Sequence, residues 1–298
     1  MTDAAGNDMQ RRGSTAAKSR SLLWTALRRI AAHPVGILGS ALIGLLLVVA
    51  VTAPLVAPHS PVTQSFKRLL PPGSANPLGT DEFGRDILSR IVFGSRISLQ
   101  VGVIAVGVAL VLGGTLGLFS GFFRGVVDTL VQRVVDILLA IPGVILIIAI
   151  SGVIGPSMGT SMIAIGIVYS PAFARVIRGS TLAVVGEQYV EAARATGASP
   201  WRLIFRHVVP NVLAPVIVQV TLSFSTAILA EATLSYLGLG TQPPDPSWGT
   251  MLASGRKYLD LAPGLTVFPG LAIMLAVLGF NLLGDALRDA LDPRLKQR

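Results

Sequence analysis

Residues 137–174 read ILLAIPGVILIIAISGVIGPSMGTSMIAIGIVYSPAFA and contain no Asp, Glu, Lys or Arg. As one α-helix these 38 residues would extend about 57 Å, nearly twice the roughly 30 Å of a bilayer's hydrocarbon core. Residues that favour turns lie in the middle of the stretch: Gly152, Gly155, Pro156 and Gly159. The stretch therefore predicts two membrane-spanning helices, at about 137–154 and 160–174.

Four further blocks lack charged residues, and each is long enough to cross a bilayer once: 34–66, 97–123, 207–230 and 261–284. At 298 residues, 52% hydrophobic and 13% charged, the chain is too apolar for a water-soluble globule. The fold expected is an all-α integral membrane protein whose transmembrane domain covers 34–286. Its six expected spans are about 35–57, 98–121, 137–154, 160–174, 211–230 and 263–284.

Positive charge gives the expected orientation, because Lys and Arg are concentrated in cytoplasmic segments. The segments 1–34, 124–136, 175–206 and 285–298 carry 17 Lys and Arg against 9 acidic residues, whereas the remaining segments carry 7 against 6. Both termini are therefore expected in the cytoplasm, on a multi-pass protein of the cytoplasmic membrane. The basic residues are spread over separate segments beside the membrane, which favours contact with lipid and argues against nucleic-acid binding.

The chain ends are expected to be tails, at 1–33 and 287–298. The first is polar and basic and leads into an amphipathic stretch around Leu22–Ile30. It is not expected to be a cleaved signal peptide, because the polar lead is long and the apolar run after His33 exceeds a signal's apolar region. The chain has no cysteine, so no disulfide, thiolate nucleophile or cysteine metal site is possible.

The expected spans contain few groups that could bind ions or protons. Glu231, at the outer end of the fifth span, is the one candidate acid, and an interfacial role is as plausible as a pathway role. Mild polar residues that could face a pore or gate are Tyr169, Gln219, Ser223 and Asn281. Glycines at every fourth position of the second span predict close approach of a neighbouring helix: Gly113, Gly117 and Gly121.

Signatures of resident catalysis are missing from the sequence. There is no G-x-x-x-x-G-K-[ST] phosphate loop, no H-E-x-x-H zinc motif and no G-x-S-x-G nucleophile elbow. The three histidines, His33, His59 and His207, are far apart in the sequence. We therefore expect a protein that is not an enzyme, binds no cofactor or metal and takes its energy from elsewhere.

A charged segment, EQYVEAARATGASPWRLIFRHVVP at 187–210, interrupts the apolar sequence. Its alanine-rich first part favours a helix, and Gly197 lies where a helix end needs a left-handed residue. Ser199 and Pro200 are typical of an N-cap and first turn, so a second short helix is expected. The residues alone leave two interpretations open: a helix–turn–helix that docks a partner, or a surface loop with an ion pair between Glu191 and Arg194.

This segment resembles the E-A-A, three residues, G, nine residues, I-x-L-P signature of ABC importer permeases. The matching positions are Glu191, Ala192, Ala193, Gly197 and Pro210. The chain departs from the signature at His207, where Ile is usual, and at Val209, where Leu is usual. The branch of the family that imports peptides and nickel is similar to this chain in having R-H-x-x-P at the corresponding positions, which are 206–210 here.

Other segments, in the same order along about 220 residues, also look like that branch. They are Gly79-Thr80-Asp81 with Gly84-Arg85-Asp86 and Ser89-Arg90; Ser235 to Gly240 with Pro243 to Gly249; and Phe280 to Asp285 with Arg288-Asp289 and Leu291 to Arg294. For the outer segments 79–90 and 243–249, docking or gating and a purely structural turn both remain open. Trp248 is expected at the membrane interface.

The resemblance implies one of two permease subunits, usually of a heterodimer, with two ATP-hydrolysing subunits in the cytoplasm and a solute-binding protein outside. The coupling residues carried over are Glu191, Ala192, Ala193, Gly197 and Pro210, and ATP is hydrolysed by the partners. Di- or oligopeptides are the substrate expected first, and nickel or another small solute is the alternative. A self-contained channel, or a membrane sensor or enzyme, is the competing class.

Overall fold

The computed structural model describes residue 30 and residues 33–291. Apart from residues 30 and 33, the expected N-terminal tail with its amphipathic stretch lies outside the described residues, as do the last seven residues of the C-terminal tail. Within 33–291 the chain forms helices, turns and one isolated β-bridge between Thr80 and Asp86, and no strand. The prediction of an all-α protein is confirmed for this part of the chain.

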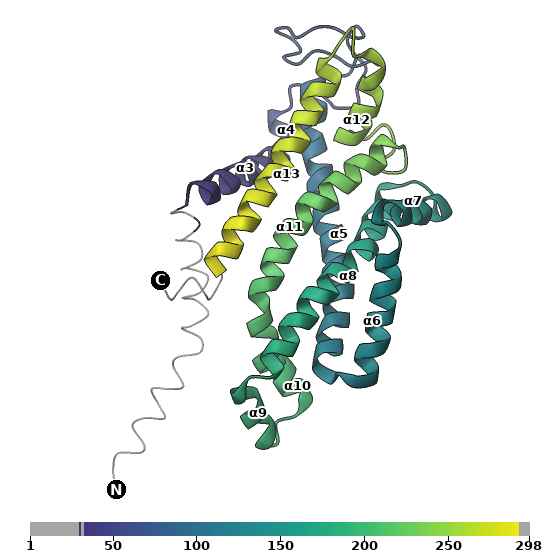
Figure 1. Ribbon diagram of the computed structural model, residues 1–298. Coiled ribbons are helices and arrows are strands. Elements are labelled where there is room, and N and C mark those ends of the chain that lie inside the picture. The colour runs from purple at the N-terminus through teal and green to yellow at the C-terminus, as the bar shows by residue number, and fades with distance from the viewer. Residues whose placement is uncertain (1–29, 31–32, 292–298) are drawn as a thin grey trace.

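The helices follow one another with short connections, apart from the long loop before α5 (Figure 1). In chain order they are α3 (Pro34–Val51), α4 (Ala53–Val56), α5 (Ile87–Phe123), α6 (Gly125–Ala140), α7 (Gly143–Ile154), α8 (Met158–Val185), α9 (Gln188–Ala195), α10 (Pro200–Leu203), a π-helical turn (Ile204–Val208), α11 (Val209–Tyr236), α12 (Trp248–Gly255), a 3₁₀ turn (Arg256–Tyr258) and α13 (Gly264–Leu291).

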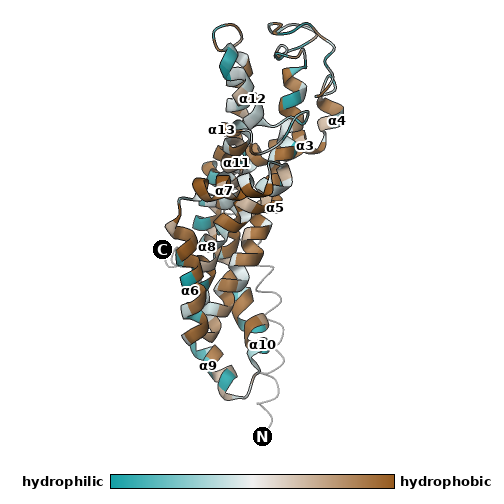
Figure 2. Cartoon of the chain, turned by 90° about the vertical axis from the view of Figure 1, so that its right-hand side faces the viewer, coloured by the Kyte–Doolittle hydropathy of each residue, from teal (hydrophilic) through white to brown (hydrophobic). Residues whose placement is uncertain are grey.

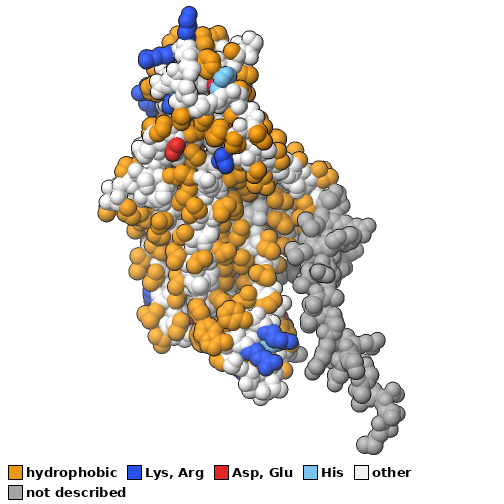
Figure 3. Space-filling model, turned by 180° about the vertical axis from the view of Figure 1, so that it is seen from behind, with side chains coloured by type: hydrophobic (Ala, Val, Ile, Leu, Met, Phe, Trp, Pro, Cys, Tyr) orange, Lys and Arg blue, Asp and Glu red, His pale blue; other side chains and the backbone are white. Residues whose placement is uncertain are grey.

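Five stretches among the described residues are long and apolar enough to cross a membrane: α3, α5, α8, the run from α10 through α11, and α13. The bent pair α6–α7 supplies a sixth candidate. Figure 2 shows hydrophobic residues along the long helices, and Figure 3 shows a broad apolar surface with Lys and Arg at both ends of that face. The structure thus supports the predicted multi-pass membrane protein.

The expected span 137–154 is not one straight helix. It consists of the end of α6 and all of α7, which meet at a bend of 90°. The break falls at Ile141 and Pro142, where Ile141 has an extended backbone. Proline disfavours the helical conformation of the residue before it and has no N–H to continue the helix, so this dipeptide accounts for the bend.

The packing of α5 against α8 forms the centre of the main apolar core. An ideal Cβ on Gly117 would lie 2.4 Å from the Ala174 carbonyl oxygen, and one on Gly121 would lie 2.9 Å from that of Arg178. The backbones of the two helices therefore meet with no space for a side chain. The close approach expected at the repeated glycines is confirmed.

The outer segment 79–90 is a hydrogen-bonded turn that starts α5. Asp81 receives hydrogen bonds from the backbone N–H groups of Phe83 and Arg85 and pairs with the Arg85 guanidinium at 2.6 Å. Asp86 caps α5 by accepting from the Ser89 N–H at 2.8 Å. These contacts bear out the structural interpretation of the segment, and its docking role stays a prediction.

Trp248, expected at the membrane interface, lies inside the protein instead. Its side chain is 2% exposed, and its indole N–H donates to the Ile91 carbonyl oxygen at 3.0 Å. Trp248 therefore fixes α12 against α5, and the expectation of an interfacial anchor was wrong.

Candidate functional site

The segment with the E-A-A signature projects at one end of the molecule, opposite the end that holds α12 and the loop before α5 (Figure 1). Val190 is completely buried and anchors α9 in the main core, whereas Glu191 and Ala192 are exposed. Ala193 is half-buried. The signature residues therefore form the outward face of an anchored helix, where a partner can reach them.

Gly197 ends α9 in a left-handed conformation, with φ of +82°. The Gly197 N–H bonds to the Arg194 carbonyl at 3.0 Å, and the Ala198 N–H bonds to the Ala193 carbonyl at 3.1 Å. These two bonds are the Schellman arrangement that satisfies the last carbonyls of a helix. The Ser199 hydroxyl then accepts from the Arg202 N–H at 3.4 Å and begins α10 with Pro200 in its first turn.

The second helix of the segment is longer than the sequence suggested. α10 continues through the π-helical turn into α11, so residues 200–236 form one 37-residue run. Leu203, Ile204 and Val208 are at most 2% exposed and join the main core. The π-helical turn precedes Pro210, which cannot donate a helical hydrogen bond, and a wider turn accommodates that loss.

A polar contact that the sequence analysis missed fastens α9 to the start of α11. The Asn211 amide donates to the Tyr189 hydroxyl at 3.1 Å and to the His207 carbonyl at 2.6 Å. The signal was present, since Asn211 is an amide within an apolar block. Its partner on α9 could not be identified from spacing, because the pair is 22 residues apart.

The described residues include no ion pair between Glu191 and Arg194, although both are exposed on α9. The surface-loop interpretation expected that pair. Beside them, Trp201 and Phe205 stack with ring centroids 6.1 Å apart and are 56% and 64% exposed. The elbow formed by α9 and α10 thus presents unpaired charges and two exposed aromatic rings.

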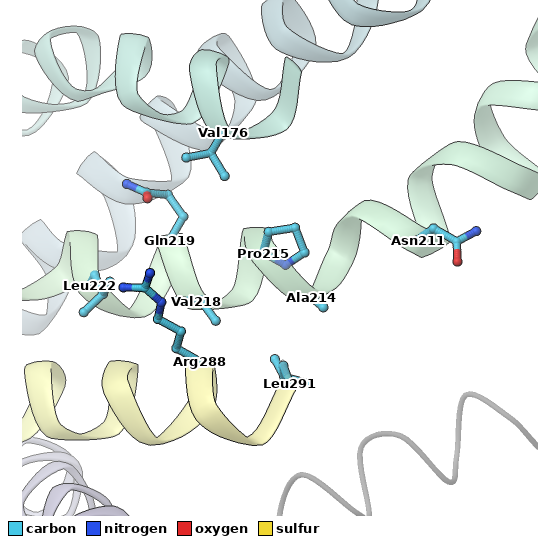
Figure 4. A pocket seen from close by; sticks show the side chains of 9 residues that line it. All are labelled: Val176, Asn211, Ala214, Pro215, Val218, Gln219, Leu222, Arg288 and Leu291. Atoms are coloured by element: carbon cyan, nitrogen blue, oxygen red, sulfur yellow. The ribbon is translucent and has the colours of Figure 1, made fainter. Parts of the chain in front are cut away.

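The four expected pore or gate residues lie on three helices, α8, α11 and α13, and each takes part in a hydrogen bond. Gln219 donates to the Ser223 hydroxyl at 3.2 Å, and Asn281 accepts from Ser225 at 2.8 Å. The Tyr169 hydroxyl reaches the Thr226 carbonyl at 3.4 Å. Of the four, Gln219 lines a cavity of about 530 Å³ between α8, α11 and α13 (Figure 4).

Glu231 is neither interfacial nor open to that cavity. It is 1% exposed, and its Oε1 atom accepts hydrogen bonds from Ser235, Thr241 and Ser247 at 2.6, 3.3 and 2.9 Å. This carboxyl group therefore holds the loop after α11 and the start of α12. Within 33–291 no group of three or more His, Asp or Glu residues could hold a metal ion.

Long apolar helices joined to an exposed, core-anchored elbow define a class of protein, the multi-pass helical membrane protein. Solved structures share the fold: a structure titled inward-facing conformations of the MetNI methionine ABC transporter matches with a TM-score of 0.57 and 18% identity, covering 69% of this chain and 98% of that chain. A structure of an amino acid ABC transporter matches with a TM-score of 0.54 and 14% identity, covering 68% and 94%.

Sequence comparison gives the family. Residues 113–297 match the model of the binding-protein-dependent transport system inner membrane component, and residues 21–72 match the N-terminal transmembrane domain of oligopeptide transport permease C. The chain belongs to the family of binding-protein-dependent transport system inner membrane components. It is therefore a permease subunit of an ABC importer, and the prediction of that class is confirmed.

Two relatives show how far the similarity extends. The chain is 46% identical over 272 residues to a dipeptide transport system permease protein of Alkalihalophilus pseudofirmus, covering 91% of this chain and 90% of the relative. It is 48% identical over 273 residues to a di/tripeptide transport system permease protein of Pseudomonas aeruginosa, covering 89% and 90%.

Proposed function

We propose that this permease subunit moves di- or oligopeptides across the cytoplasmic membrane, driven by ATP that partner subunits hydrolyse. The substrate class is supported by the two relatives just described, which are named for dipeptide and di/tripeptide transport. The similarity covers about nine-tenths of each relative's length. A relative of 47% identity from Pectobacterium atrosepticum is named for glutathione, itself a peptide. Nickel is the alternative substrate, and no feature of the described residues favours it.

One structural observation carries the proposed mechanism: the exposed elbow is continuous with a membrane-spanning helix. α10 runs into α11 without an interruption, and Asn211 ties α9 to the same helix. A force applied to Glu191, Ala192 and Ala193 would therefore move α11 and its neighbours as a rigid unit. Such rigid-body movement, driven by different contacts in two states, would switch the access of the pore.

The assembly we propose contains a second permease subunit, in a heterodimer, two ATP-binding cassette subunits at the elbow and a solute-binding protein at the opposite end. In this arrangement both termini and the elbow are cytoplasmic, in agreement with the excess of Lys and Arg in those segments. The chain itself performs no bond chemistry and binds no cofactor.

Gly197 gives a sharp test of the coupling role. A Cβ at Gly197 would meet no atom within 4 Å, so a substitution acts through the backbone conformation alone. Left-handed geometry costs an L-residue about 1–2 kcal/mol, more for a β-branched one and less for Asn. We expect Gly197→Val to reduce ATP-driven uptake of a labelled dipeptide several-fold in proteoliposomes, while Gly197→Asn stays near the wild type.

Membrane insertion and assembly of both variants serve as the control, measured by co-purification with the ATPase subunits. Uptake that is unchanged in the correctly inserted Val variant would contradict the coupling role. Transport of nickel, but of no peptide, by the wild-type importer would replace the proposed substrate with the alternative one.

A further inference from the structure

The coupling mechanism above assigns no ligand to the cavity between α8, α11 and α13, although Asn211 in its lining also ties α9 to α11. Its volume of about 530 Å³ lies within the roughly 300–1,000 Å³ of ordinary ligand pockets. The walls are mostly apolar, with three polar side chains among them. The lining residues are Val176, Asn211, Ala214, Pro215, Val218, Gln219, Leu222, Arg288 and Leu291 (Figure 4).

Arg288 contributes a positive charge to the lining of this cavity, and it is an exposed residue. Its side chain extends from α13 toward α11, beside Val218 and Leu222 (Figure 4). The neighbouring acids Asp285 and Asp289 form no ion pair with it, and the described residues offer it no hydrogen-bond acceptor. A guanidinium that no described residue pairs with can bind an anion, and its fork of N–H groups matches a carboxylate.

Two amide oxygens add acceptors to the same cavity. The amide nitrogens of Gln219 and Asn211 are engaged with Ser223, Tyr189 and His207. Their carbonyl oxygens have no partner among the described residues. Gln219 and Asn211 are eight positions apart, which is about 12 Å along a helix, so an extended chain of about three or four residues would span them.

We propose that this cavity binds the transported peptide on its way through the permease, with the peptide's C-terminal carboxylate on Arg288. The oxygens of Gln219 and Asn211 accept hydrogen bonds from the peptide's N–H groups or its ammonium. The apolar walls contact side chains without discriminating strongly between them. The inference rests on peptide transport as the proposed function. It adds that the Arg288 guanidinium binds the C-terminal carboxylate of the peptide.

A single introduced thiol tests the charge of the cavity. The chain has no cysteine, so Val176→Cys places the only thiol of this subunit in the cavity wall. In the assembled importer without ATP, we compare its labelling by an anionic and a cationic methanethiosulfonate reagent, read from the mass of this subunit. A positive unit charge near the thiol should make labelling by the anionic reagent about threefold faster, or more, than labelling by the cationic one. Arg288→Gln should abolish that preference and Arg288→Lys should keep it.

Arg124→Gln is the matched control, because Arg124 is exposed and does not line the cavity. It removes the same charge and should leave the preference intact. An unchanged preference in the Arg288→Gln variant, or an equal loss in the Arg124→Gln variant, would overturn the assignment of Arg288.

Protection from labelling then tests the ligand. Trialanine with a free carboxylate should slow the labelling of Cys at position 176, and trialanine amide should not; Arg288→Gln should remove the difference. Equal effects of acid and amide would overturn the proposal. Protection that appears only in vesicles containing phosphatidylglycerol, without peptide, would overturn it in favour of a lipid headgroup.

The two proposals fail separately. If the wild-type importer transports trialanine but the labelling shows no dependence on Arg288, only the site is wrong. If it transports no peptide, the proposed function itself fails.

Discussion

At the scale of single residues, the carboxyl group of Glu231 organises the end of the protein opposite the elbow. One oxygen atom accepts three hydroxyl hydrogen bonds, from Ser235 in α11, from Thr241 in the loop after it and from Ser247, the N-cap of α12. All the residues involved are at most 2% exposed. Leu239 of the loop after α11 also packs against the main core, and its N–H bonds to the Leu234 carbonyl oxygen at 2.9 Å. Glu231 adds the acceptor that ties this loop and the start of α12 to α11.

The prediction for this group contrasts two substitutions. Glu231→Ala removes the acceptor of three buried O–H donors, at a cost on the order of 1–3 kcal/mol for each donor left unsatisfied. Glu231→Gln keeps an oxygen in the same place and should cost much less. Thermal unfolding of the purified subunit in detergent should show a large decrease in Tm for Ala and a small one for Gln. Equal decreases would mean that the hydroxyls find other partners.

The sequence predicted single residues well where backbone geometry is local. Gly197, Ser199 and Pro200 act at positions set by their immediate neighbours, so their roles follow from residue type. Trp248 and Glu231 were misjudged or left open because their partners lie far away in sequence. The Trp248 indole bonds to a carbonyl 157 positions away, which no local pattern indicates.

At the scale of helices, the contact between α5 and α8 depends on glycines that face the partner helix. Gly117 meets the Ala174 carbonyl so closely that an added methyl group would have to push the helices apart. Gly107 lies on the same helix, but nothing lies within 4 Å of the position of its Cβ. Substitutions at Gly117 and Gly107 therefore distinguish the effect of helix packing on stability from the effect of helix propensity.

We expect Gly117→Ala to destabilise the protein by about 1–3 kcal/mol, the usual cost of overpacking. Gly107→Ala should be neutral or stabilising by up to about 1 kcal/mol, because Ala favours the helix over Gly. The midpoint of denaturant unfolding in mixed micelles measures both. A loss of stability in both variants would show that glycine is needed for another reason, such as bending of α5.

The helices differ from the predicted spans mainly where two elements join. Charge-free blocks locate the apolar middle of a helix and not its ends, so α5 begins eleven positions before the expected 98. Pro142 ends α6 although no turn was expected there. The continuity of α10 with α11 was also missed, because the charge-free block begins only after Arg206, whereas the helix continues through that residue.

At the scale of the whole molecule, charge and shape agree on two distinct ends. α9 and α10 lie at one end, and the loop after α11 lies at the other (Figure 1). The apolar surface between the two ends fits the membrane interior, so either end could in principle be the cytoplasmic one. We infer from the excess of Lys and Arg that the elbow is cytoplasmic, since short loops with this excess are retained in the cytoplasm.

The absence of cysteine makes this orientation directly measurable. Glu187→Cys marks the elbow and Asp245→Cys marks the opposite end, and both positions are exposed. A membrane-impermeant maleimide added to intact spheroplasts should label Cys at 245 and not at 187, whereas permeabilised membranes should allow both. Because both thiols react after permeabilisation, burial by a partner cannot imitate protection by the membrane. The reverse labelling pattern would place the elbow outside, out of reach of any ATPase, and would remove the basis of the proposed coupling.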